Sequence, residues 1–141
     1  MIEVIVVLGI IGIIASLGII AGIDMYQRYN FRSDIDSITV FLEKARSQSI
    51  NNIGGAAYGV KIDDAEKKLI LFKGATFDTR DTSYDFEIAM NPASVYSGAS
   101  EVGFAQLSGQ VALCVTPCTI NVTDGPRIIS VTVNHEGGIN Y

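Results

Sequence analysis

A single carboxylate precedes a long apolar run at the start of the chain, and its position suggests charge pairing rather than catalysis. Glu3 is followed by Val4 to Ile23, which comprise fifteen aliphatic residues, four glycines, one serine and no charge. An ionisable group at the edge of such a run is costly to desolvate, so it is a functional hypothesis by default. The most economical role for Glu3 is to pair with a positive charge inside a packed bundle of similar helices. The alternative is that Glu3 simply lies at the level of the lipid headgroups.

Two cysteines offer a second kind of chemistry. Cys114 and Cys118 are spaced as Cys-Val-Thr-Pro-Cys and could form a disulfide or remain free thiols. A bridge across so short a loop would fix a local turn more than it would stabilise the whole domain. A structural zinc site needs four ligands, and two cysteines with the distant His135 do not supply them. We therefore expect no metal site and no other cofactor.

Acid–base catalysis has few candidate residues. His135 is the single histidine, with Glu136 beside it and Asp124 upstream. The sequence contains no Gly-x-Ser-x-Gly motif, no phosphate-binding loop and no paired metal motif. We expect a protein that is not an enzyme, and we assign no catalytic residue.

The charge distribution disfavours nucleic acid as a partner. The formal net charge is −5, and residues 54–141 carry six basic and ten acidic side chains. After Arg80 the only basic residue is Arg127. Nucleic-acid binding depends on clustered lysine and arginine side chains, which this half of the chain lacks.

One long helix in two halves must position Glu3. Residues 1–23 supply the stretch of about twenty apolar residues that an α-helix needs to cross a bilayer. Residues 24–53 contain no helix breaker and predict an amphipathic continuation that ends at Gly54-Gly55. Its apolar positions recur near a 3.6-residue period: Ile35, Ile38, Phe41, Leu42, Ala45 and Ile53. Such a helix is about 75–80 Å long, so its first half must find partners in lipid or in other subunits.

Residues 54–141 have the pattern of a small β-rich head. The expected strands are residues 58–62 and 68–73 in one hairpin, 84–89, 102–107 and 110–115 in a second hairpin, 119–122 and 127–133. The sequence therefore predicts an α+β fold, in which a long N-terminal α-helix, its first half membrane-spanning and its second half amphipathic, packs on a small antiparallel β-rich head.

The start of the chain resembles the N-terminal methylation motif of type IV pilins and type II secretion pseudopilins. The resemblance covers Ile2 to Ala15, in which Ile2 and Glu3 match the Ile-Glu pair of that family. Met1 stands where the family has leucine, and the basic leader, the cleavage glycine and the Phe-Thr pair are missing. We therefore expect the true start of the gene to lie upstream.

Two segments of the head add to the resemblance. The Tyr58-Gly59-Val60 strand and the Leu107-Ser108-Gly109 hairpin look like those of the GspH- and FimT-type minor pseudopilins. The resemblance implies a structural subunit, a minor pilin or pseudopilin, of a type IV pilus or type II secretion-like filament. It also implies that Glu3 neutralises the N-terminal amine of a neighbouring subunit.

The resemblance further implies a location and a set of partners. The chain would sit in the cytoplasmic membrane as a single-pass protein with its head outside, and then in an extracellular or periplasmic filament. Its partners would be other pilin or pseudopilin subunits, the membrane before assembly, and the filament assembly machinery. A head outside the cytoplasm favours the disulfide between Cys114 and Cys118. Four glycines could let helices approach closely, the last two as a GxxxG motif: Gly9, Gly12, Gly18 and Gly22. The alternative for the GxxxG motif is local melting of the helix when the subunit leaves the membrane, because glycine destabilises a helix interior.

Two other functions remain open from the sequence. The first is a single-pass, membrane-anchored binding domain that never polymerises. The second is a competence pilin that captures DNA, which the acidic C-terminal half disfavours.

Overall fold

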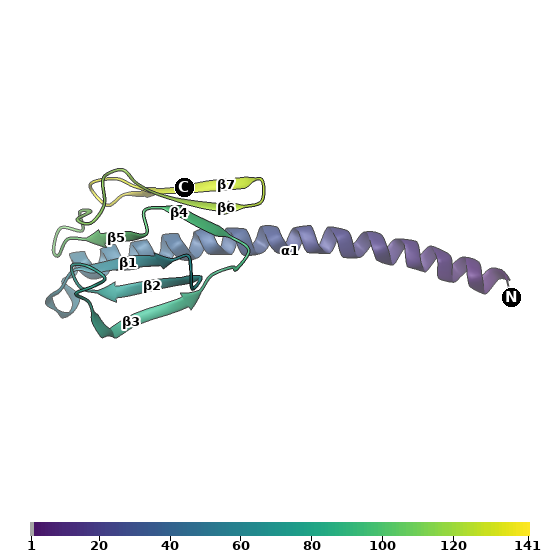
Figure 1. Ribbon diagram of the computed structural model, residues 1–141, viewed down its shortest axis with the longest axis horizontal. Coiled ribbons are helices and arrows are strands. Elements are labelled where there is room, and N and C mark those ends of the chain that lie inside the picture. Colours follow the sequence, from purple (N-terminus) through teal and green to yellow (C-terminus); the bar gives the residue numbers. More distant parts are fainter. Residues whose placement is uncertain (1) are drawn as a thin grey trace. The chain divides into compact units, whose positions relative to one another are not determined.

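One helix and two antiparallel sheets make up the protein. The computed structural model describes the backbone of residues 2–141 and the side chains of residues 2–15 and 25–141. The chain divides into two compact units, Met1–Arg32 and Ser33–Tyr141. Helix α1 (Ile2–Ile50) begins in the first unit and ends in the second, and the strands all belong to the second unit (Figure 1).

The C-terminal part of α1 packs on the strands through the predicted apolar face. Its apolar positions are at most 6 % exposed: Ile35, Ile38, Phe41, Leu42 and Ala45. Phe41 also contacts Phe86 of the head, with the two ring centroids 5.6 Å apart. The predicted packing of an amphipathic helix half on the head is therefore confirmed in the second unit.

The helix ends earlier than the sequence predicts. Asn52 takes a left-handed conformation, with φ of 51°, and a short 3-10 helix, η1 (Ile53–Gly55), follows. Because the backbone has already left the α-helical path, Ile53 is 48 % exposed and does not belong to the buried face. The predicted end at residue 53 is thus three residues too long.

The strands form two four-stranded sheets. The first has the order β3-β2-β1-β5, from β1 (Tyr58–Asp63), β2 (Lys68–Lys73), β3 (Asp81–Ala89) and β5 (Glu101–Phe104). The second has the order β4-β6-β7-β8, from β4 (Val95–Gly98), β6 (Cys118–Asp124), β7 (Arg127–Val133) and β8 (Ile139–Asn140). Neighbouring strands are antiparallel in both sheets. The predicted α+β class, with an N-terminal helix on antiparallel strands, is confirmed.

One of the two predicted hairpins forms as expected. Strands β1 and β2 pair from Tyr58↔Lys73 to Asp63↔Lys68. The second predicted hairpin forms only in part: Val111 bridges to Phe104 and backbone hydrogen bonds join the two segments, but residues 110–115 do not form a strand. Leu107 and Gly109 in the turn take positive φ values. The chain then runs irregularly through the Cys114–Cys118 loop before β6 begins.

Two glycines that face each other in the first sheet leave room for the side chains of Phe72 and Leu113. Gly59 of β1 lies opposite Gly103 of β5 in the register. A Cβ atom on Gly59 would collide with the ring of Phe72, and one on Gly103 would collide with Leu113. Phe72 is fully buried, so its ring occupies the space that a side chain at position 59 would need.

Candidate functional site

The N-terminal segment of α1 is apolar on every side. Its large side chains are between 53 % and 76 % exposed: Ile2, Val4, Ile5, Val6, Val7, Leu8, Ile10, Ile11, Ile13 and Ile14. A helix that is hydrophobic all round needs an apolar environment on all its faces, either in lipid or among other helices. This segment, residues 2–15, is therefore the candidate assembly surface.

Glu3 lies in the first turn of this helix and is exposed. A carboxylate there interacts favourably with the positive end of the helix dipole. Its exposure leaves it open to a positive charge on another chain, which is the role predicted for it.

Two of the four predicted packing glycines can be placed. A Cβ atom built on Gly9 or Gly12 meets nothing within 4 Å, so the helix surface at these positions is open. Open glycines in an apolar helix allow another helix to approach its backbone closely. Gly18 and Gly22 lie outside the described residues.

The predicted membrane span, Val4 to Ile23, includes positions whose side chains are not described. Over the described residues, no helix has the length and apolar character needed to cross a membrane.

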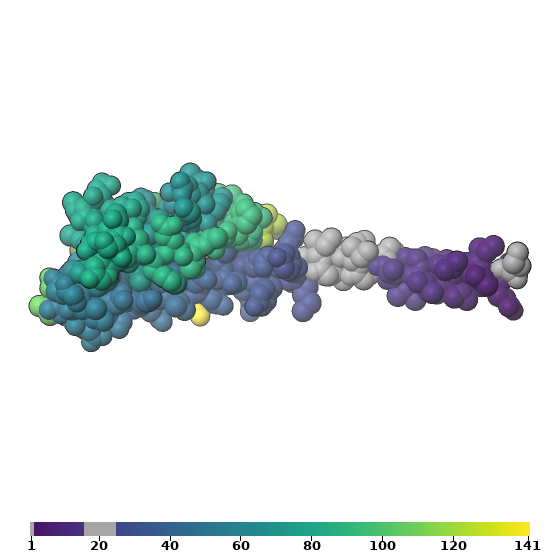
Figure 2. Space-filling model, turned by 90° about the horizontal axis from the view of Figure 1, so that it is seen from below, coloured from purple at the N-terminus to yellow at the C-terminus, as the bar shows by residue number. Residues whose placement is uncertain are grey.

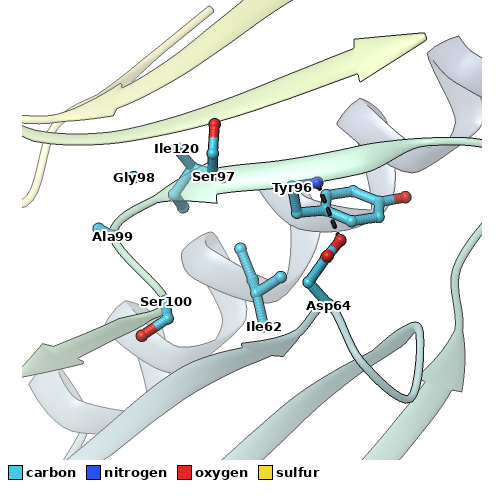
Figure 3. Close-up of a pocket in the computed structure, with 8 residues that line it drawn as sticks. All are labelled: Ile62, Asp64, Tyr96, Ser97, Gly98, Ala99, Ser100 and Ile120. Carbon is cyan, nitrogen blue, oxygen red and sulfur yellow. Dashed lines mark hydrogen bonds between the residues drawn. The ribbon is translucent and has the colours of Figure 1, made fainter.

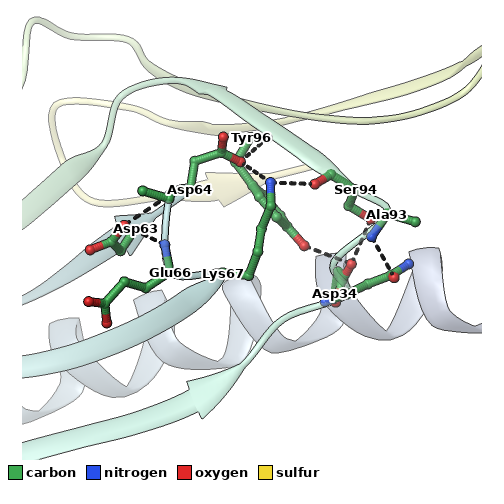
Figure 4. Close-up of polar contacts among 10 residues, drawn as sticks. Asp34, Asp63, Asp64, Glu66, Lys67, Ala93, Ser94 and Tyr96 are labelled. Atoms are coloured by element: carbon green, nitrogen blue, oxygen red, sulfur yellow. Dashed lines mark hydrogen bonds and ion pairs between the residues drawn. The ribbon is translucent and has the colours of Figure 1, made fainter.

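A buried carboxylate holds the connection between the two sheets against α1 (Figure 4). Asp34 of α1 is 7 % exposed. Its Oδ2 accepts hydrogen bonds from Ser94 Oγ at 2.9 Å and from Tyr96 Oη at 2.8 Å, and its Oδ1 accepts one from the backbone N–H of Asn91 at 3.2 Å. We call these four residues the Asp34 clamp. Its donors are neutral, so it is built for positioning rather than for proton transfer.

The clamp changes the acidity of its tyrosine. Burial raises the pKa of the Tyr96 hydroxyl well above its usual range, and the hydrogen bond to the Asp34 carboxylate raises it further. Tyr96 therefore remains a neutral hydrogen-bond donor throughout the physiological pH range.

The turn between β1 and β2 extends the same network. Lys67 Nζ lies 2.6 Å from Asp64 Oδ1 and donates to the carbonyl of Ser94 at 2.9 Å, and the backbone N–H of Tyr96 donates to Asp64 Oδ1 at 3.0 Å. The hydrogen bond from Lys67, followed by that from the Tyr96 N–H, lowers the pKa of Asp64. The connection is thus held from both sides, by α1 and by the first sheet.

A small pocket opens at the seam between the two sheets (Figure 3). It has a volume of about 70 Å³ and is lined by Ile62, Asp64, Tyr96, Ser97, Gly98, Ala99, Ser100 and Ile120. Sites for small-molecule ligands usually measure about 300–1,000 Å³. The pocket is therefore a gap in the seam rather than a ligand site.

The other predicted chemical residues lie apart from the clamp in the chain. Cys114 and Cys118 are joined by a disulfide, with Cα atoms 5.8 Å apart, and Cys118 opens strand β6. His135 follows β7. Within the described part of the chain, no three His, Cys, Asp or Glu side chains come together as a possible metal site.

Sequence reasoning missed the Asp34 clamp, although the sequence holds a signal for it. Asp34 stands four residues before Ile38 and three after Phe31, which places it on the apolar face of the helix. A charge on a buried face needs partners. The partners themselves could not be named, because β4 was not predicted.

The fold is similar to that of a minor pseudopilin. No protein-family model matches the chain, and no curated protein matches its sequence. Two solved structures of the minor pseudopilin EpsH from the type 2 secretion system of Vibrio cholerae superpose with TM-scores of 0.55 and 0.52, at 17 % and 15 % sequence identity. Each match covers 79 % of this chain and 94 % of the other. At this level of identity, the likeness establishes a pseudopilin-like fold.

Proposed function

We propose that the chain is a structural subunit, a minor pilin or pseudopilin, of a type IV pilus or type II secretion-like filament. The observation that carries the proposal is the helical segment 2–15, which is apolar on every side and belongs to a chain with a pseudopilin-like fold. This combination suits a protein that assembles by its helix and displays its head.

The apolar helix serves two stages in turn. Before assembly it holds the subunit in the cytoplasmic membrane, with the head outside. The assembly machinery then extracts the subunit, and the helix packs against those of other subunits in the filament core. Both environments satisfy an all-round apolar surface, so the transfer exchanges lipid contacts for protein contacts.

Glu3 and the open glycines give this packing its specificity. A carboxylate entering an apolar core is tolerated when it meets a positive charge, so Glu3 selects the one position along a neighbouring subunit where such a charge lies. Gly9 and Gly12 allow the neighbouring helix to come close.

The Asp34 clamp supports the same role from the head. It fixes the connection between the sheets to the helix that carries the load of assembly. A head built in this way keeps its shape when its helix is pulled from the membrane.

The test compares two aspartate substitutions at exposed isoleucines. Ile10 and Ile128 are 53 % and 66 % exposed, but only Ile10 lies in the apolar segment. Aspartate at the centre of a membrane helix costs about 3 kcal/mol, which lowers the equilibrium constant for insertion about 100-fold, so Ile10→Asp should reduce the amounts of membrane-bound and filament-bound protein. Ile128→Asp should leave both unchanged.

Membrane extraction and sheared filaments, probed by immunoblot, give the two readouts. Wild-type amounts of Ile10→Asp in both fractions would refute the proposal. A wild-type chain that stays in the membrane and never enters filaments would favour the anchored binding domain instead.

A further inference from the structure

The segment that follows strand β5 covers the outer edge of the first sheet. Strand β5 is the last strand of that sheet and pairs with β1 on one side. On its other side, the backbone N–H of Ala112 donates to the carbonyl of Gly103 at 2.8 Å. The backbone N–H of Ala105 donates to the carbonyl of Gln110, also at 2.8 Å. We call residues 110–117, which run along this edge and on to β6, the strap.

The strap also contacts the second sheet. It lies in the second unit, which Figure 2 shows in blue to yellow and whose residues are all described. The backbone N–H of Val111 donates to the carbonyl of His135, which follows β7, at 3.0 Å. The side chain of Val111 is buried, and Leu113 fills the space that a side chain on Gly103 would need. The strap therefore bridges the two sheets where the chain crosses from one to the other.

The disulfide fastens the far end of the strap. Cys118 is the first residue of β6 and is 1 % exposed, so this end of the bridge is fixed in the core of the second sheet. Cys114 is half-buried and directly follows Leu113. The bridge holds the Cα atoms of the two cysteines 5.8 Å apart, which keeps Leu113 beside Gly103.

The strap has a weaker hold of its own. Its residues carry no charge, and beyond Leu113 it turns into solvent, where Val115 is 93 % exposed. Segments with few buried contacts open locally, without unfolding of the whole domain. The two cysteines are 4 positions apart, and a bridge across so short a loop constrains such a local opening more than it constrains global unfolding.

We propose that the disulfide between Cys114 and Cys118 is a redox-sensitive latch that holds the strap over the edge of β5. In the oxidised head the edge is covered. In the reduced head the strap is released, and the carbonyl of Gly103 and the N–H of Ala105 lose their partners. An uncovered strand edge pairs readily with a strand of another chain, so the closed latch protects the head from such pairing. The latch belongs to the head alone and does not depend on assembly through the helix.

The latch opens by thiol–disulfide exchange with a dithiol. Because Cys118 is buried, the attacking thiolate bonds to Sγ of Cys114 and forms a mixed disulfide there. The bond between the two cysteine sulfurs breaks, and Sγ of Cys118 leaves as a thiolate that takes up a proton. The second thiol of the dithiol then displaces Sγ of Cys114. In total, the dithiol is oxidised to a disulfide, and two electrons and two protons pass to the two cysteines.

Hydrogen–deuterium exchange of the purified full chain in detergent micelles tests the latch, with dithiothreitol as the dithiol. The amides of Val111 and Ala112 report on the strap, and those of the paired strands β1 and β2 serve as the internal reference. Reduction should speed exchange at the two strap amides about tenfold or more and leave the reference unchanged. Reoxidation should restore the original rates.

Three results would overturn the proposal. The first is unchanged exchange at the strap in a chain whose reduction is confirmed by intact mass. The second is an equal acceleration of the strap and the reference, because the bridge would then stabilise the whole head. The third is a loss of protection that reoxidation does not reverse.

Two truncations on either side of Cys114 give a matched pair of variants. With the bridge intact, Leu113→Ala should speed exchange at Ala112, because it removes the side chain that fills the space beside Gly103. Val115→Ala should match the wild type in both redox states, because Val115 lies in solvent. Equal effects of the two variants would contradict the seat of the strap on β5.

Discussion

At the scale of single residues, Asp34 is a buried carboxylate that accepts three hydrogen bonds from the head. Asp34→Ala should lower the free energy of unfolding by about 3 kcal/mol, because Ser94, Tyr96 and Asn91 each lose their acceptor. Asp36→Ala, at an exposed position on the same helix, should change it by less than about 0.5 kcal/mol. Urea unfolding of the two variants provides the comparison. Equal effects would mean that the clamp contributes nothing.

Tyr96 gives the head a dependence on alkaline pH. Its pKa in the folded state lies above the ordinary value of 10.0, so the folded state holds the hydroxyl proton more tightly than the unfolded chain does. The resulting stability is fully present below pH 10 and is lost as the pH rises above it.

Tyr96→Phe should remove this dependence. At pH 8 the variant should be about 1 kcal/mol less stable, for one lost hydrogen bond. The difference from wild type should shrink between pH 10 and pH 11.5, measured by urea unfolding at each pH. A stability difference that stays constant across that pH range would show that folding does not change the pKa of Tyr96.

At the scale of elements, the packing of the β2 residue Phe72 against strand β1 depends on a glycine at position 59. Gly59→Ala should cost about 1–3 kcal/mol, because the added methyl group collides with the buried ring of Phe72. In the background Phe72→Leu, which makes room, the same substitution should cost less than half as much. Thermal unfolding of the four chains of this double-mutant cycle gives the coupling. Full additivity would exclude the predicted contact.

The elements that the sequence predicts well are those with strong local patterns. The hairpin of β1 and β2 follows from alternation around a charged turn, and the buried face of α1 follows from its 3.6-residue period. Strand β7 follows from the alternation that buries Val131 and Val133. Each of these patterns needs only neighbours in the sequence.

The elements that the sequence misses depend on distant residues. Strand β4 is four residues long, and its partners are distant in the sequence: it pairs with β6, and Tyr96 donates to Asp34, sixty-two residues earlier. Residues 110–115 look like a strand, but the positive φ of Leu107 and the Cys114–Cys118 loop redirect the chain. Neither constraint can be read from a local sequence pattern.

At the scale of the whole molecule, the chain combines two surfaces of opposite character. Residues 2–15 present an apolar helix, and residues 33–141 form an acidic head with its own core. The candidate assembly surface could be identified from sequence, because its signal is a continuous run of residues. The Asp34 clamp could not, because it is assembled from segments that only the fold brings together.

The most direct test of assembly through the helix is the removal of the charge at Glu3. Glu3→Val and Glu3→Gln should both remain in the membrane, because loss of a carboxylate makes insertion easier. Their amount in sheared filaments should fall at least about tenfold relative to wild type, because the pairing with a neighbouring subunit is lost. Immunoblots of membrane and sheared fractions from the same cells measure both quantities. Wild-type amounts of either variant in the filaments would contradict a role of Glu3 in assembly.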